Sequence, residues 1–373
     1  MEMMEEKIAE STLDENVDDK RKSKKPIIIT LIIVFIVLIA AFLLYFAIFK
    51  TNDNGDNCLF RDGLVPMSIE GSYGYIDKNG KYVINPQFVN AWGFSDGLAL
   101  VYDGNKLGFI DKSGSFVINP QFDYAGNFAK NGLAWVEVGE KYGYIDKSGS
   151  LVIDPQFDWA GDFENGLACV GIGEKYGYID KSGSFVINPQ FDYADYFEKD
   201  GLALVYDDDK WGYIDKTGSF VINPQFDYAG YFAENGLAWV RVGDKYGYID
   251  KSGNFVINPQ FDDAGYFAKN GLAYVSVEDK YGYIDKSGSF VIDPRFDYAE
   301  LFAKNGLACV IVGDKYGYID KSGSFVIDPQ FENASYFFDD GYAVVSIDGK
   351  YGIIDKKGNY IVSAQYGMIS GLY

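Results

Sequence analysis

Aspartates at a fixed spacing are the residues of this chain that could most directly bind a metal ion. Nine of them share one setting, in which a lysine follows at once and a glycine stands three residues on: Asp77, Asp111, Asp146, Asp180, Asp215, Asp250, Asp285, Asp320 and Asp355. A calcium site needs about six or more converging oxygen atoms, and a single Asp beside a Lys supplies them poorly. Asp in such a tetrapeptide is typical of a tight turn, where it accepts backbone N–H groups. The sequence therefore predicts turns, with no metal and no cofactor.

Catalytic residue sets are missing from the sequence. The chain has no histidine, which removes Ser–His and Cys–His nucleophiles and histidine metal sites. Its three cysteines are too few for a disulfide scaffold. Cys169 and Cys309 occupy a position that Leu100, Trp135 or Tyr274 fills elsewhere, which indicates small apolar filler residues. We therefore predict that the protein is not an enzyme.

Tyrosine pairs are the stronger candidates for binding. Most copies of the repeat place a glycine between two tyrosines, so that both rings lie on one face of a strand. The candidate binding residues are Tyr142 and Tyr144, Tyr176 and Tyr178, Tyr246 and Tyr248, and Tyr316 and Tyr318. Two interpretations are open. The rings could form a platform for sugars or an extended peptide, or they could be the apolar core between repeats.

Differences between the copies offer a second pointer. The middle of the first strand and the connector vary most, as in Tyr196, Tyr231, Tyr266 and Leu301. If one surface is adapted to a partner, it should be this one. Random drift at exposed positions explains the variation equally simply.

The repeat itself dominates the chain. Its central glycine recurs at positions 74, 108, 143, 177, 212, 247, 282, 317 and 352, so nine units of 34 or 35 residues follow one another. Repetition at this period is typical of stacked modules, in which each unit packs on its neighbours.

Each unit contains three predicted strands. In one copy these are 132–138, 142–146 and 151–154, joined by tight turns into an antiparallel meander, and Pro155 is expected to end the third strand. A connector follows with the spacing Phe-x-x-Ala-x-x-Phe, as in Phe122, Ala125 and Phe128. Spacing of three predicts a single helical or 3₁₀ turn.

The units are expected to form an all-β repeat domain over residues 59–373. Every unit is complete when counted from its Gly-Leu pair, and no blade is divided between the two chain ends. This favours an open or superhelical stack of three-stranded meanders, with a closed propeller-like ring as the alternative.

The N-terminal region differs in composition. Residues 1–25 form a charged, cytoplasmic tail that is expected to be disordered, and residues 50–58 form a linker. Between them, residues 26–49 carry no charge and are long enough for one transmembrane helix. Basic residues before this segment place the N-terminus in the cytoplasm and the repeats outside. The net charge of −21 disfavours nucleic acid as a partner.

The unit resembles the bacterial WG-repeat family. The best match is Trp211-Gly212-Tyr213-Ile214-Asp215-Lys216, followed by Pro224-Gln225-Phe226, and the resemblance covers about residues 60–366. Most other units have Tyr where the family has Trp. The resemblance implies β-rich repeats, often at the bacterial cell surface, without a shared enzymatic activity.

Two functions remain open from the sequence. The first is a membrane-anchored extracellular scaffold that binds a cell-wall glycan or another surface protein. The second is a structural stalk or spacer without a ligand of its own. The single apolar segment and the abundant aromatic residues, 17% of the chain, favour the first.

Overall fold

The computed structural model describes residues 58–369. The predicted tail 1–25, the predicted transmembrane helix 26–49 and the linker up to residue 57 lie outside the described residues. Within the part of the chain that is described, no helix has the length and apolar character needed to cross a membrane.

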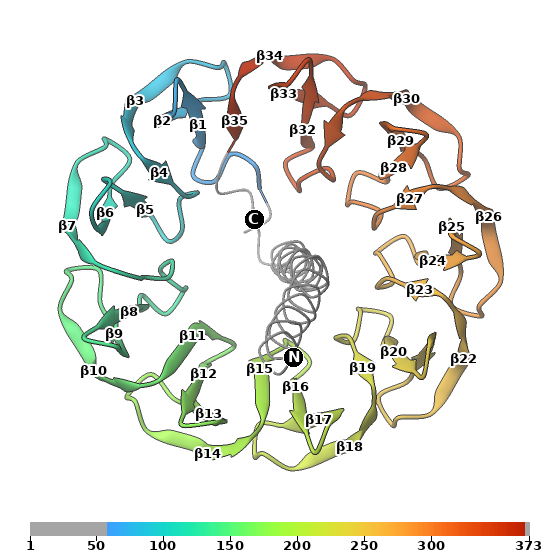
Figure 1. Ribbon diagram of the computed structural model, residues 1–373, viewed down its shortest axis with the longest axis horizontal. Helices are drawn as coiled ribbons and strands as arrows, with labels where there is room; N and C mark the ends of the chain where they lie inside the picture. The colour runs from blue at the N-terminus through green and yellow to red at the C-terminus, as the bar shows by residue number, and fades with distance from the viewer. Residues whose placement is uncertain (1–57, 370–373) are drawn as a thin grey trace, which may run out of the picture. The chain divides into compact units, whose positions relative to one another are not determined.

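Nine antiparallel sheets stand side by side around a ring (Figure 1). One such blade consists of β15 (Tyr193–Phe197), β16 (Leu202–Asp207), β17 (Lys210–Asp215) and β18 (Phe220–Phe226), hydrogen-bonded in that order. In every blade except the first, the chain enters at the inner edge and leaves at the outer rim, from which it passes to the next blade. The described residues therefore form an all-β, nine-bladed propeller ring.

The other blades repeat this order. The inner strands are β4 (Asn90–Ala91), β11 (Trp159–Glu164), β19 (Tyr228–Ala229), β23 (Asp263–Ala264), β27 (Tyr298–Ala299), β31 (Asn333–Ala334) and β35 (Met368–Ile369). The next strands are β1 (Val65–Ile69), β5 (Ala99–Tyr102), β8 (Ala134–Val138), β12 (Leu167–Ile172), β20 (Ala238–Val242), β24 (Ala273–Val277), β28 (Ala308–Val312) and β32 (Tyr342–Ile347). The third strands are β2 (Ser72–Ile76), β6 (Leu107–Ile110), β9 (Lys141–Ile145), β13 (Lys175–Ile179), β21 (Lys245–Ile249), β25 (Lys280–Ile284), β29 (Lys315–Ile319) and β33 (Lys350–Asp355). The outer strands are β3 (Tyr82–Phe88), β7 (Phe116–Phe122), β10 (Leu151–Phe157), β14 (Phe185–Phe191), β22 (Phe255–Phe261), β26 (Phe290–Phe296), β30 (Phe325–Phe331) and β34 (Tyr360–Tyr366).

The predicted meander is confirmed, but the predicted end of the third strand at Pro155 is wrong. Strand β10 continues through Pro155 to Phe157, and its register against β9 shifts between Ile153 and Phe157. The resulting bulge brings the backbone of β10 against Gly143, where a Cβ atom would lie 2.5 Å from the Ile153 carbonyl oxygen. An outer strand tolerates Pro because its free edge needs no further ladder donor.

The predicted helical turn in the connector is also wrong. The connector is a short inner strand instead, and its alanine pairs with the next strand, as Ala194 does with Val205. In the blade that contains β8, this strand is reduced to the single bridge between Ala125 and Val136.

The aspartate turns are confirmed as turns. In the copy at Asp146, the Oδ1 atom accepts the N–H groups of Ser148 at 2.9 Å and Ser150 at 3.1 Å. Gly149 closes the turn with φ +84°, a left-handed conformation that glycine adopts without steric cost. The Ser148 hydroxyl and these N–H groups hold the pKa of Asp146 below its usual value.

The expected open stack is wrong, because the C-terminal strand completes the first blade. Strand β35 pairs with β1, with Met67 opposite Ile369 and Ser68 opposite Met368, so the first sheet has the order β3-β2-β1-β35. Tyr366 also packs against Tyr82 with ring centroids 6.4 Å apart, and its hydroxyl donates to the Gly80 carbonyl at 3.3 Å. Closure removes the two exposed ends that an open array would leave unpaired.

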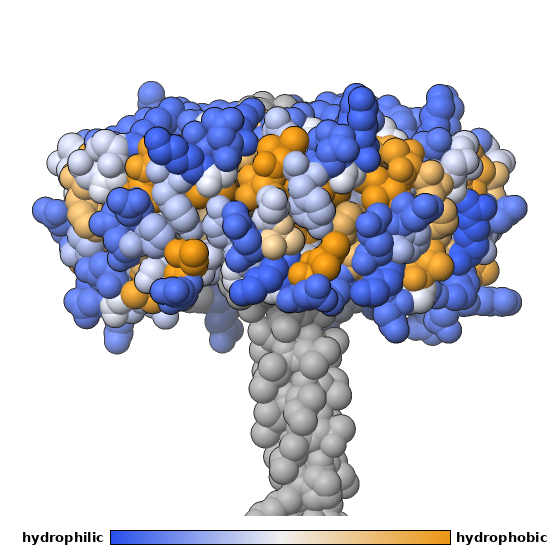
Figure 2. All heavy atoms as spheres, turned by 90° about the horizontal axis from the view of Figure 1, so that it is seen from above, coloured by the Kyte–Doolittle hydropathy of each residue, from blue (hydrophilic) through white to orange (hydrophobic). Residues whose placement is uncertain are grey.

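The outer rim carries exposed apolar residues in every outer strand. Each outer strand exposes one Val or Ile, such as Val152 at 47% and Val256 at 47%, next to a half-exposed aromatic or Leu residue. Figure 2 shows these apolar patches between the polar turns. The proline in most of these strands interrupts a free edge that could otherwise pair with another chain.

Candidate ligand-binding surface on the inner strands

The structure divides the eight predicted tyrosines into two groups. The second member of each pair is fully buried at 0% exposure, which applies to Tyr144, Tyr178, Tyr248 and Tyr318. The first member is half-buried, which applies to Tyr142, Tyr176, Tyr246 and Tyr316. A buried ring does not reach a ligand from solvent, so the pairs do not form one continuous exposed stripe.

The buried tyrosines connect neighbouring blades. Tyr144 lies in β9, and its hydroxyl donates to the Gly161 carbonyl in β11 of the next blade at 2.8 Å. Tyr178, Tyr248 and Tyr318 make the same bond 17 residues downstream, at 2.5, 2.7 and 2.8 Å. Burial raises the pKa of the Tyr144, Tyr178 and Tyr248 hydroxyl groups well above the usual value, so they stay protonated donors. Their role is in the core.

The residues at the variable connector position come together in or just after the inner strands. This position lies two residues after the connector alanine, and in three consecutive blades it holds Tyr196, Tyr231 and Tyr266. Tyr196 and Tyr231 stack with ring centroids 5.3 Å apart and an interplanar angle of 28°. Tyr231 and Tyr266 follow at 6.3 Å and 15°. We call these three residues the tyrosine ladder.

Carboxylates accompany the tyrosine ladder. The Tyr231 hydroxyl donates to Asp195 Oδ2, and the Tyr231 N–H group donates to the Tyr266 hydroxyl oxygen at 3.2 Å. Glu198 hydrogen-bonds Tyr196, while burial raises the pKa of Glu198 to about 7. The equivalents of Asp195 in the next two blades are Gly230 and Gly265. The tyrosine ladder thus combines three half-buried aromatic rings with the acidic groups Asp195 and Glu198, both of which come from the blade of Tyr196.

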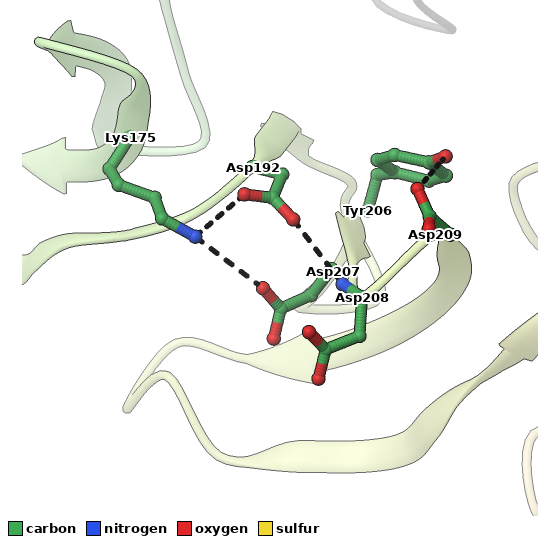
Figure 3. Close-up of polar contacts among 6 residues, drawn as sticks. All are labelled: Lys175, Asp192, Tyr206, Asp207, Asp208 and Asp209. Carbon is green, nitrogen blue, oxygen red and sulfur yellow. Dashed lines mark hydrogen bonds and ion pairs between the residues drawn. The ribbon is translucent and has the colours of Figure 1, made fainter.

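The same blade is acidic at its other end, in the hairpin between β16 and β17 (Figure 3). Lys175 of the preceding blade pairs with Asp192 at 2.6 Å and with Asp207 at 3.9 Å, and the Asp208 N–H group donates to Asp192 at 3.3 Å. Lys175 holds the pKa of Asp192 below its usual value, whereas burial raises the pKa of Asp207. Asp208 and Asp209 form the turn with φ of +50° and +62°.

These acidic groups do not converge on a metal. Between residues 58 and 369, no group of three or more Cys, Asp or Glu side chains is arranged to hold an ion. These carboxylates already have partners, because the Tyr206 hydroxyl donates a hydrogen bond to Asp209 at 3.3 Å and Lys175 forms ion pairs with Asp192 and Asp207. The hairpin therefore carries charge on the surface without forming an ion site.

Comparison with known proteins assigns the repeat. The model of the WG containing repeat matches nine consecutive segments, at residues 73–106, 108–142, 142–176, 176–211, 211–246, 246–281, 281–316, 316–351 and 351–372. The chain belongs to the WG-containing repeat family. No curated protein matches it in sequence.

Solved structures resemble the WG-repeat ring in fold alone. The crystal structure of the eukaryotic initiation factor aligns with a TM-score of 0.60 at 11% identity, over 80% of this chain and 94% of that chain. Apo AztD from Citrobacter koseri aligns with a TM-score of 0.40 at 12% identity, over 81% of this chain and 95% of that chain.

One feature of the WG repeats was not predicted from the sequence. Two positions face each other on neighbouring strands, and in several blades a small residue at one position accompanies a large residue at the other, which we call the size exchange. Where the residue after the connector alanine is Gly126 or Gly265, the facing residue is Trp135 or Tyr274. A Cβ atom at Gly126 would lie 2.2 Å from the Trp135 indole nitrogen. Where Glu300 replaces the glycine, the facing residue is Cys309. Counting the two positions together across the units would have found this signal.

The size exchange accounts for Cys309, which faces Glu300, but not for Cys169, which faces Gly161. There Trp159 fills the space, since a Cβ atom at Gly161 would lie 2.9 Å from the Trp159 Cη2 atom. Cys169 and Cys309 are buried free thiols, as their interpretation as filler residues predicts. Glu300, beside Cys309, has a buried Oε2 atom without a hydrogen-bond partner. Burial raises the pKa of Glu300 to about 8.

Proposed function

We propose that this WG-repeat protein is a non-enzymatic binding scaffold, anchored through residues 26–49 with the ring outside the cell. The contact surface we propose is the tyrosine ladder with Asp195 and Glu198. The observation that carries the proposal is the stack itself, because the repeats are nearly identical elsewhere and this group of half-buried rings occurs in three consecutive blades.

A protein partner suits this geometry better than a cell-wall glycan. The glycan interpretation depended on a stripe of exposed rings along an open stack, whereas the ring buries half of the tyrosine pairs and distributes the others around a circle. A compact cluster of aromatic rings beside carboxylates resembles the centre of a protein interface, where Tyr is enriched and a cationic residue of the partner finds an acceptor.

The test is photo-crosslinking in cells that produce the full-length chain. A photoreactive residue replaces Tyr196 or Tyr266, and the control replaces Val256, which is 47% exposed on the outer rim. We expect one discrete protein adduct from the ladder positions, lost when Asp195→Ala is added, and no such adduct from position 256.

Two other outcomes would redirect the function. Adducts to wall polymer, together with sedimentation of the chain with isolated cell wall, would support the glycan as the ligand instead. The absence of any adduct from the ladder, with no retention on wall material, would leave the spacer as the remaining function.

A further inference from the structure

The ninth unit differs from the eighth at four positions that lie close together in the ring. Phe338, Asp340, Tyr342 and Ile353 stand where the preceding unit has Ala303, Asn305, Leu307 and Tyr318. Tyr342 is the one residue other than Leu at its position among the nine units, and Ile353 is the one aliphatic residue at its own. Such a concentrated change points to a contact that the other blades do not make.

That contact is with Leu59 and Phe60, which precede the first strand. Their side chains are 2% and 4% exposed and share one core cluster with Phe338 and Ile353. The ring of Phe60 meets Tyr342 edge-on, with centroids 5.6 Å apart and an angle of 80°. The Phe60 N–H group donates to Asp340 Oδ2 at 3.1 Å.

Phe60 occupies the position that, in the other blades, belongs to a connector continuous with the inner strand. Residues 60–64 match residues 94–98 of the second blade in sequence pattern, and both segments form the same tight turn, bridged between Arg61 and Leu64 and between Ser95 and Leu98. Phe94 follows its inner strand β4 directly in the chain. Phe60 does not, because the inner strand of its blade, β35, comes from the other end of the chain.

The joint between the ninth and first blades lacks two contacts that recur elsewhere. Ile353 has no hydroxyl group to make the bond that Tyr144 and its equivalents make to the next blade. Gly367 stands where most units have an aspartate that pairs with the lysine 17 residues earlier, as Asp262 pairs with Lys245. At this joint Leu59 and Phe60 instead pack in one cluster with Phe338 and Ile353.

We propose that Leu59 and Phe60 form a closure strap, which locks the C-terminal strand into the first blade. That blade is thus assembled from both chain ends, and it opens when the strap leaves the ninth blade. A mechanical force applied to the chain before residue 58 acts on the strap before it acts on any other part of the ring. The strap therefore makes closure of the ring dependent on the segment that precedes it.

Hydrogen exchange on the full-length chain tests the strap. Phe60→Ala should raise the exchange rate of amides in β1 by at least about tenfold, because local opening of the seam becomes less costly. Labelling of Cys58, the half-buried cysteine beside the strap, should accelerate with it, whereas the buried Cys169 and Cys309 stay unreactive. Amides of β20 and β21, in another part of the ring, should exchange as in the wild type.

Phe197→Ala is the matched control, since Phe197 is also buried and packs against Tyr178 with ring centroids 4.7 Å apart, but it lies in β15, whose blade is continuous in the chain and does not contact β1. It should leave exchange in β1 unchanged. Tyr342→Leu, which restores the residue of the other eight units, tests the same contact without removing Phe60 and should raise exchange in β1 by a smaller factor. Unchanged exchange in β1 for both strap variants, or an equal rise with Phe197→Ala, would overturn the proposal.

Discussion

Each buried tyrosine contributes a hydroxyl group as well as a ring. Tyr144 lies between two blades, and its hydroxyl group satisfies the carbonyl of Gly161 in a position that water does not reach. Loss of one partner of a buried hydrogen bond costs more than the bond is worth on average, because the other partner stays unsatisfied. The spacing of the Tyr-Gly-Tyr pairs predicted that both rings share one face, but not that one ring is buried and the other is not.

We expect Tyr144→Phe to lower the free energy of unfolding by about 1–3 kcal/mol, because the Gly161 carbonyl loses its donor. Tyr142→Phe, two residues earlier in the same strand and half-buried, should change it by less than about 0.5 kcal/mol. Denaturant unfolding of the full-length chain measures both. Equal effects of the two substitutions would show that the hydroxyl bond between blades contributes nothing specific.

Glu300 should make the stability of the ring depend on pH. Its folded pKa is raised to about 8, so the folded state holds a proton that the unfolded chain releases near pH 4.5. The stability that this proton provides is complete below about pH 4.5 and is lost as the pH rises through about 8. Glu300→Gln removes this dependence, so its stability relative to wild type should rise between pH 5 and pH 9, by on the order of 3 kcal/mol.

The measurement is thermal or denaturant unfolding of both proteins at the two pH values. Glu174→Gln, on the exposed hairpin that follows β12, serves as the control and should show no such change. A constant difference between wild type and Glu300→Gln across this range would mean that Glu300 is hydrated in the folded ring.

At the scale of the strands and turns, much of the unit could be predicted from the sequence. The turn at Asp250 and Gly253 was predictable because Asp and Gly at this spacing favour only a few local backbone conformations. The connector was not, because Ala at a spacing of three fits a helical turn and a two-residue strand equally well. What decides between them is pairing with the next strand, as in Ala264 opposite Val275, and such pairing is absent from local sequence.

Gly253→Val should destabilise the ring by about 1–3 kcal/mol. The residue has φ +82°, where a β-branched side chain is strained, and a Cβ atom there would lie 3.3 Å from Ile222 Cγ2 of the preceding blade. Gly243→Asp is the control, because its φ is +62° with no atom within 4 Å of a new Cβ, and Asp208 occupies the same turn position elsewhere at φ +50°. A Gly253→Val protein that unfolds like Gly243→Asp would show that the turn is not constrained by the neighbouring blade.

At the scale of the whole molecule, the error in the sequence-based prediction came from the choice of unit boundary. Counting from Gly-Leu made every unit complete, so no divided blade was visible. Counting from the connector would have shown that the first unit lacks its inner strand, while Tyr366, Ile369 and Leu372 repeat the connector spacing after the ninth. Closure depends on contacts between residues about 300 apart, such as Met67 and Ile369, which no local pattern reveals.

The candidate site was predictable only in outline. The variable connector position pointed to Tyr196, Tyr231 and Tyr266, but it took the ring to show that the three stack on consecutive blades. Asp195 and Glu198 gave no separate signal, because isolated acidic residues in an acidic chain are usually solvated.

The most direct test of closure is disulfide trapping between the two ends of the ring. Ser68→Cys and Met368→Cys are introduced together in a Cys58→Ser background, since Ser68 lies opposite Met368 in the β1–β35 pair. Ser68→Cys with Asn333→Cys is the control, because Asn333 holds the equivalent place on the neighbouring blade, in β31. A closed ring predicts rapid oxidation of the first pair within a single chain and none of the second. Failure of the first pair to oxidise, or oxidation only between two copies, would contradict the nine-bladed ring.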